Sequence, residues 1–138
     1  MNWIEPALVI IVHEVELRKR GGLPGLADRG ALESALYRPQ QLLGYQPETT
    51  LWQLAACYCE AIVAAHAFND ANKRTAFIIA ATFLEDNGYR VEADQLGIVM
   101  TMTAVAEHGL TADQLANWFQ RNSVKIETLA ERPPLRSK

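Results

Sequence analysis

The chain has 138 residues, of which 49% are hydrophobic and 21% are charged, a balance typical of one globular domain with a sizeable core. Its formal net charge of -3 supplies no global positive field, so autonomous, non-specific binding to nucleic acid is disfavoured. A local cationic site stays open.

The N-terminal part predicts two helices joined by an irregular turn. No secretory signal opens the chain, which predicts an unprocessed, cytoplasmic protein. The first helix is expected over Glu5–Arg20, because this segment begins with an acid and a proline and ends with three cations. The turn GGLPG follows, with three glycines and a proline in five residues. The second helix is expected from Arg29 to Pro39.

The central part of the chain predicts two largely buried helices. Residues 50–65 are almost apolar all round and carry one charge, Glu60, which is typical of a central helix. This run is too short for a bilayer, which needs roughly 20 apolar residues. Cys57 and Cys59 point to different helix faces, so we expect two buried free thiols, in keeping with a reducing compartment. The segment TAFIIAATFLEDNG predicts the second buried helix, ending at its Asn-Gly pair.

The C-terminal part predicts two amphipathic helices near residues 93–107 and 111–122, with Thr111 and Asp113 supplying capping chemistry. We find no alternating strand pattern and no internal repeat. The sequence therefore predicts an all-α, compact single-domain bundle of about six helices over residues 1–122. Residues 123–138 are expected to form a C-terminal extension that is either extended or disordered.

A polar nonapeptide, HAFNDANKR, separates the two central helices at residues 66–74. If the second helix begins near Asp70 to Asn72, Lys73 and Arg74 lie in its first turn, where unpaired N–H groups already create positive potential. Each cation there should cost very roughly 0.3 to 1 kcal/mol. A bound phosphate removes this cost, because it accepts from the amides and from both cations. The alternative is that the cations extend into water or pair with Asp70, and that Asp70 or Asn72 only caps the helix.

Other residues of the nonapeptide fit the same hypothesis. His66 ends the preceding helix and is a candidate general base, although a helix C-terminus favours its protonated form. Asp70 is a candidate ligand for Mg2+, with nucleotide phosphates and water completing the shell. Phe68 is expected to anchor the loop by burial. Asn69 and Asn72 are expected to hold the loop backbone through hydrogen bonds.

Features outside the nonapeptide suggest smaller roles. His13 and His108 are expected to be structural or exposed rather than catalytic. The GGLPG turn either approaches a nucleotide or target closely, as glycines allow, or only reverses the chain. Direct DNA binding through Lys73 and Arg74 is disfavoured, because two adjacent cations are a small footprint for a duplex.

HAFNDANKR closely resembles the signature of the Fic/Doc superfamily, H-x-F-x-[D/E]-[G/A]-N-[G/K]-R, and its Ala71 and Lys73 are similar to the Doc branch. The segment RGGLPGLADRGALESALYRP, residues 20–39, also resembles the segment that precedes the motif in Doc toxins. The resemblance extends through at least Gly88. It implies a Doc-like toxin of a type II toxin-antitoxin system.

The resemblance also implies a reaction. Fic proteins typically transfer AMP from ATP to a target hydroxyl, whereas Doc toxins transfer the terminal phosphate of ATP to elongation factor Tu and arrest translation. The AMP-transferring branch usually has a second arginine where this chain has Phe77, which cannot hold a phosphate, and Lys73 adds a cation near the loop. These two differences from the AMP-transferring branch favour the kinase activity. A Fic-like AMP transferase and a catalytically silent helical binding domain remain alternatives.

The resemblance implies site residues, cofactors and partners. The catalytic residues it implies are His66, Asp70, Asn72, Lys73 and Arg74, and the nucleotide-binding residues are Asn69, Asp70, Asn72, Lys73 and Arg74, with Asp70 at the metal. His66 would accept the proton of the target hydroxyl, while the other groups position the phosphates and neutralise them. ATP is the expected substrate, with Mg2+. A cognate antitoxin with a disordered segment that folds onto an apolar groove is the expected partner. Neither direct nucleic-acid binding nor a membrane is expected.

Overall fold

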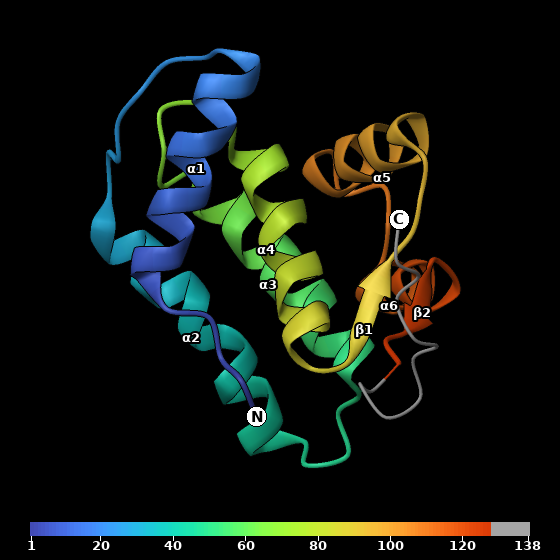
Figure 1. The fold of residues 1–138 in the computed structure, drawn as a ribbon. Coiled ribbons are helices and arrows are strands. Elements are labelled where there is room, and N and C mark those ends of the chain that lie inside the picture. Colours follow the sequence, from blue (N-terminus) through green and yellow to red (C-terminus); the bar gives the residue numbers. More distant parts are fainter. Residues whose placement is uncertain (128–138) are drawn as a thin grey trace, which may run out of the picture.

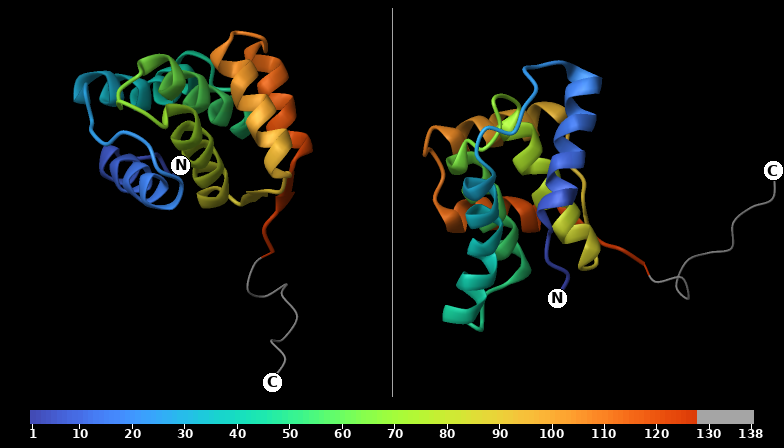
Figure 2. Two further views of the ribbon diagram at one scale, coloured as in Figure 1. Left: turned by 90° about the horizontal axis from the view of Figure 1, so that it is seen from above. Right: turned by 90° about the vertical axis from the view of Figure 1, so that its left-hand side faces the viewer.

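The computed structural model describes residues 1–127, which form six helices and two short strands (Figure 1). In chain order these are α1 (Pro6–Arg20), α2 (Arg29–Tyr45), α3 (Leu51–Ala65), α4 (Asn72–Asp86), β1 (Tyr89–Val91), α5 (Gln95–Ala106), α6 (Ala112–Arg121) and β2 (Ser123–Lys125). The predicted all-α bundle is therefore confirmed. Helix α3 is central, because it packs most extensively against α4, α2 and α6. Helices α1 and α5 lie on opposite sides of α4 (Figure 2).

Local sequence explains where the central helix starts and what it buries. Thr50 caps α3 through a capping box with Gln53, in which each side chain bonds the other residue's backbone N–H. The helix then buries residues on nearly all sides, as its apolar composition predicts. Both cysteines are free; Cys59 is buried in the core and Cys57 is half-buried. A central, buried α3 gives the loop that follows it a rigid starting point.

One sequence expectation is corrected by the structure. Helix α2 does not end at Pro39 but continues to Tyr45. Pro39 leaves the Ala35 carbonyl without its usual donor. The proline ring is itself buried, however, and Leu42 and Leu43 in the last turns pack against the core. This burial favours the longer helix.

The structure also contains two short strands, although no alternating strand pattern was found in the sequence. Strands β1 and β2 pair antiparallel, with Arg90 opposite Val124. Each has three residues, which is too short for an alternating pattern to be detected in the sequence. The predicted extension, residues 123–138, thus begins with a paired strand, and its part from residue 128 onward lies outside the described residues.

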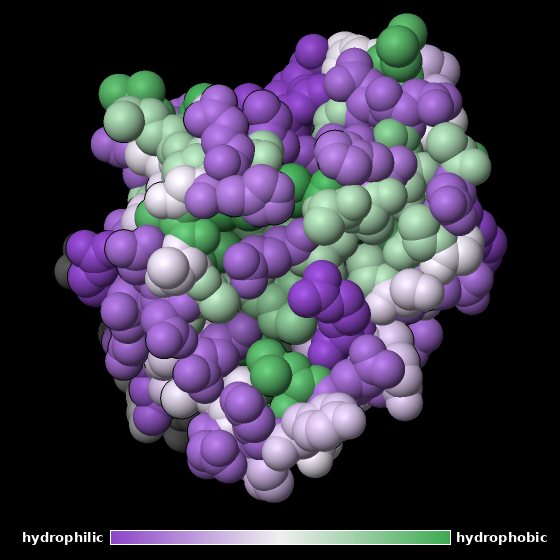
Figure 3. Space-filling view, turned by 180° about the vertical axis from the view of Figure 1, so that it is seen from behind, coloured by the Kyte–Doolittle hydropathy of each residue, from purple (hydrophilic) through white to green (hydrophobic). Residues whose placement is uncertain are grey.

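The described surface is mixed in polarity. Figure 3 shows the face opposite to that of Figure 1, where polar side chains dominate and small apolar areas lie between them. Within residues 1–127, no helix combines the length and the apolar character that crossing a bilayer requires.

Candidate functional site

The connection between α3 and α4 is a short loop held by two residues in left-handed backbone conformations. His66 follows α3 with φ 46°, and Ala71 precedes α4 with φ 64°. Neither is glycine, so each conformation costs about 1 to 2 kcal/mol. Such strain persists only where surrounding contacts fix the backbone, and it often marks a functional loop. The contacts that hold this loop are therefore informative.

The side chain of Asn72 provides the first support of the loop. The Asn72 side chain accepts from the Phe68 N–H at 3.2 Å and donates to the Phe68 carbonyl at 2.9 Å, which closes the loop on itself. Phe68 is only 3% exposed and so anchors the loop in the core. His66, at the other end of the loop, is exposed, and its imidazole has no hydrogen-bond partner within residues 1–127. Its ring is thus available to a reacting group.

The GGLPG turn of residues 21–25 forms the second support. Asn69 donates from its backbone N–H to the Gly25 carbonyl and from its side chain to the Pro24 carbonyl, at 3.1 and 3.0 Å. The next residue of the turn region, Leu26, forms an isolated antiparallel bridge with Phe68. The turn therefore lies directly against the loop between α3 and α4 (residues 66–71), which we call the motif loop. It thus does more than reverse the chain.

Asp70 is held as an ionised carboxylate. Its Oδ2 accepts from the Leu23 N–H at 3.1 Å, and its Oδ1 accepts from the Ala71 N–H at 2.8 Å. These two hydrogen bonds, followed by the nearby Arg74 charge, lower the pKa of the Asp70 carboxyl below its ordinary value. Two backbone donors leave further lone pairs on this carboxylate, so it retains the capacity to coordinate a cation.

The start of α4 offers unpaired backbone donors. Within residues 1–127, the N–H groups of Asn72, Lys73 and Arg74 have no acceptor, and Ala71 supplies no side-chain cap. Lys73 is exposed, and Arg74 donates to the Gly21 carbonyl at 3.0 Å. This helix start therefore combines three free amides with two cations, which is the arrangement that binds phosphate.

Two glycines of the turn are structural parts of this site that the sequence did not identify individually. A Cβ on Gly22 would lie 2.9 Å from Asp70 Oδ2, and a Cβ on Gly25 would lie 2.6 Å from Asn69 Nδ2. Both glycines also have positive φ, 131° and 118°. The turn can approach the loop this closely only because these side chains are absent.

We expect Gly25→Ala to destabilise the protein by about 1 to 3 kcal/mol, because alanine is strained at this φ, and also to weaken the nucleotide binding expected from the sequence by displacing Asn69. Gly88→Ala is the matched control, since Gly88 has φ 104° but nothing within 4 Å of its added Cβ. Thermal unfolding and nucleotide titration separate the two effects. Equal nucleotide affinity in the two folded variants would show that the contact with Asn69 is unimportant.

His13 is a further neighbour of the loop, and its position was not predicted. It lies on α1, is 3% exposed, and stacks on Phe68 with ring centroids 3.8 Å apart. Its Nε2 lies 2.9 Å from the Asp70 carbonyl oxygen. No local pattern around residue 13 indicates this contact, because it depends on how α1 packs against α4.

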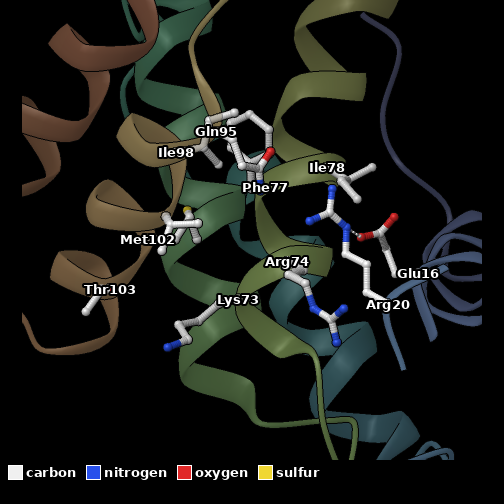
Figure 4. A pocket seen from close by; sticks show the side chains of 11 residues that line it. Glu16, Arg20, Lys73, Arg74, Phe77, Ile78, Gln95, Ile98, Met102 and Thr103 are labelled. Atoms are coloured by element: carbon white, nitrogen blue, oxygen red, sulfur yellow. Dashed lines mark ion pairs between the residues drawn. The ribbon is translucent and has the colours of Figure 1, made fainter. Parts of the chain in front are cut away.

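A groove of about 190 Å³ lies beside the start of α4, between α1 and α5 (Figure 4). Its cationic edge contains Arg20, which pairs with Glu16 at 3.4 Å, together with Lys73 and Arg74. Its apolar wall is formed by Phe77, Ile78, Ile98, Val99 and Met102. Phe77 belongs to this wall and stacks with Phe119, so the position three residues after Arg74 is apolar packing surface.

The donors for a metal ion are few. Among residues 1–127, no group of three or more His, Cys, Asp and Glu side chains is placed to hold a metal ion. A structural metal site built from protein ligands alone is therefore not formed by the described residues. The Asp70 carboxylate suits the other mode, in which Mg2+ takes one or two carboxylates and completes its shell with phosphates and water.

The chain is similar to known proteins. A family model described as the Fic/DOC family matches residues 3–84. The chain is 41% identical over 91 residues to "Protein kinase doc" of Escherichia phage P1, covering 66% of this chain and 72% of that protein. It is 40% identical over 75 residues to "Toxin Doc" of Mycolicibacterium smegmatis, covering 54% of this chain and 58% of that protein. The family match spans the α3–α4 loop, the glycine turn and His13.

Proposed function

The chain belongs to the Fic/DOC family, and on this premise we propose that it is a Doc-like toxin and an ATP-dependent protein kinase. It transfers the terminal phosphate of ATP to a hydroxyl of a protein target, proposed to be elongation factor Tu, and so arrests translation. The observation that carries this proposal is the start of α4, where three free amides and two cations share one helical turn. The names of the two relatives, a protein kinase and a toxin, support it.

The proposed reaction is an in-line phosphoryl transfer. The oxygen of the target hydroxyl forms a bond to the terminal phosphorus of ATP, the bond to the bridging oxygen breaks, and ADP leaves. His66 takes the hydroxyl proton. The free amides of α4, with Lys73 and Arg74, hold the phosphates and offset their spreading negative charge. Asn69 and Asn72 contribute to nucleotide binding by holding the loop that presents these amides.

The Asp70 carboxylate fits the Mg2+ that accompanies ATP. It is ionised and is oriented by the Leu23 and Ala71 amides. It also lies close in sequence to the first turn of α4, where the phosphates are proposed to bind. When bound, Mg2+ would neutralise charge on the phosphates. Asp70 would supply the protein ligand.

Phe77 favours transfer of the terminal phosphate over transfer of AMP. It is part of an apolar wall and contacts other aromatic rings, so it offers no donor to a phosphate. We expect label from the terminal phosphate of ATP to reach the target, and label from the alpha phosphate to stay in the nucleotide. Incubating the purified chain with its target and each labelled ATP tests this. Transfer of the alpha label alone would identify an AMP transferase instead.

We also propose that a cognate antitoxin inhibits the toxin by occupying the groove between α1 and α5. The groove has an apolar wall and a cationic edge, which suits an amphipathic segment that carries acidic residues. Such an occupant would lie beside Lys73 and Arg74, so it would compete for the charges that bind phosphate. The antitoxin would then inhibit the toxin by blocking Lys73 and Arg74, without changing the fold of the toxin.

Val99→Glu is expected to weaken antitoxin binding by about tenfold or more, because it replaces apolar contact with a charge that repels an acidic segment. Val99 lines the groove and is 50% exposed, so the change should leave folding intact. Val124→Glu is the matched control, since Val124 is 44% exposed on β2. Calorimetric titration with the antitoxin encoded beside the toxin measures both. Equal affinities for the two variants would exclude this groove.

A further inference from the structure

His13 makes a contact whose chemistry can be assigned from geometry. Its Nε2 lies 2.9 Å from the carbonyl oxygen of Asp70, and a carbonyl oxygen can only accept a hydrogen bond. The Nε2 atom must therefore bear the ring N–H hydrogen and act as the hydrogen-bond donor. The ring plane is fixed as well, because His13 stacks on Phe68 with an angle of 13° between the rings. His13 thus presents a rigid, oriented donor to the motif loop.

The acceptor is part of the peptide group that joins Asp70 to Ala71. Because a peptide group is planar, fixing its carbonyl also fixes the direction of the Ala71 N–H. That N–H donates to Asp70 Oδ1 at 2.8 Å. The orientation of this one peptide therefore determines both the hydrogen bond to the Asp70 carboxylate and the direction of the backbone at the start of α4.

This peptide directly precedes a residue with a strained backbone conformation. It leads into Ala71, whose left-handed conformation sets the direction in which α4 begins. The three free amides of residues 72–74 follow at once. If the peptide rotated, Asp70 would lose a donor and the free amides would no longer be held in one orientation.

The other supports of the loop act elsewhere. Asn72 bonds the backbone of Phe68, the glycine turn bonds Asn69, and Leu23 bonds the Asp70 side chain. Among residues 1–127, no other group donates to the Asp70 carbonyl. His13 is therefore the described residue that restrains the Asp70–Ala71 peptide from α1.

We propose that His13 is a positioning residue of the phosphate site. It holds the Asp70–Ala71 peptide in the orientation that aligns the α4 amides with the phosphates and the Asp70 carboxylate with the metal. This assignment rests on the proposed function for its consequence in catalysis. The restraint on the peptide itself does not depend on which group of ATP is transferred.

His13→Leu, His13→Gln and Val9→Ala together test the proposal. Leucine keeps an apolar side chain in the buried site but removes the donor, whereas glutamine keeps an N–H donor. Val9 is a fully buried residue of the same helix, so its truncation destabilises α1 packing without removing that donor. Binding of a non-hydrolysable ATP analogue with Mg2+ and hydrogen exchange of the Ala71 amide are measured for all three full-length variants, under conditions where each is folded.

We expect His13→Leu to weaken analogue binding by about tenfold or more and to speed exchange of the Ala71 amide. His13→Gln should recover most of both properties, and Val9→Ala should match the unsubstituted chain in both. Unchanged exchange in His13→Leu, or equal defects in Val9→Ala, would overturn the proposal. Failure of the proposed function looks different, because the unsubstituted chain would then fail to transfer the terminal phosphate while the exchange result still decides the role of His13.

Discussion

Replacing His66 with alanine is expected to lower the rate of target phosphorylation by roughly 10²- to 10⁴-fold, which is the usual contribution of a general base. His66 is exposed and its ring has no hydrogen-bond partner within residues 1–127, so removing the ring breaks no hydrogen bond among these residues. The stability change should therefore be small. Nucleotide binding should persist, because the α4 amides and Asp70 are unchanged.

The backbone of residue 66 complicates the alanine variant, and a second variant resolves this. His66 has φ 46°, where alanine is less easily accommodated than histidine or asparagine. His66→Asn tolerates this conformation but supplies no base near neutral pH, so it should be folded and equally inactive. His108→Ala is the matched control, since His108 is also exposed with positive φ, 57°. Retained phosphorylation in folded His66→Asn would refute the role of His66 as base.

The helices could be predicted because their signals are local. Thr50 and Thr111 occupy N-caps and form capping boxes with Gln53 and Gln114, and the apolar composition of α3 indicated its central place. The end of α2 could not be predicted in this way. At Pro39, the local rule for proline opposed the burial of Leu42 and Leu43, and burial prevailed only because α2 lies against the core.

The site was predictable where it is contiguous in sequence. The motif loop and the first turn of α4 occupy nine neighbouring residues, so helix polarity pointed to an anion site there as one of two interpretations, the other being cations that extend into water or pair with Asp70. The supports of the loop are distant in sequence. Gly22, Gly25 and His13 contact it only after α1 and the turn have packed against α4, and no spacing rule relates residue 13 to residue 70.

Asp70→Asn is expected to reduce activity strongly and to raise the Mg2+ concentration needed for half-maximal phosphorylation by about tenfold or more, because a neutral amide is a poor ligand for this cation. Asp28→Asn is the matched control. Asp28 caps α2 by accepting from the Ala31 N–H at 2.9 Å, and asparagine caps equally well. Initial rates over a Mg2+ titration compare the variants. An unchanged Mg2+ requirement in Asp70→Asn would remove Asp70 from the metal site.

The same substitution should change how stability depends on pH. The pKa of Asp70 is lowered in the folded state, chiefly by the hydrogen bond from Leu23 and then by that from Ala71. Its stabilising contribution is therefore present above the unfolded pKa of about 3.9 and is lost as pH falls through the lower folded value. Asparagine cannot accept from both amides and titrates nowhere in this range. The stability difference between wild type and Asp70→Asn should thus be largest near neutral pH and should shrink below about pH 4. Chemical denaturation from pH 7 to pH 3 measures it, and a difference that grows on acidification would contradict the assigned hydrogen bonds.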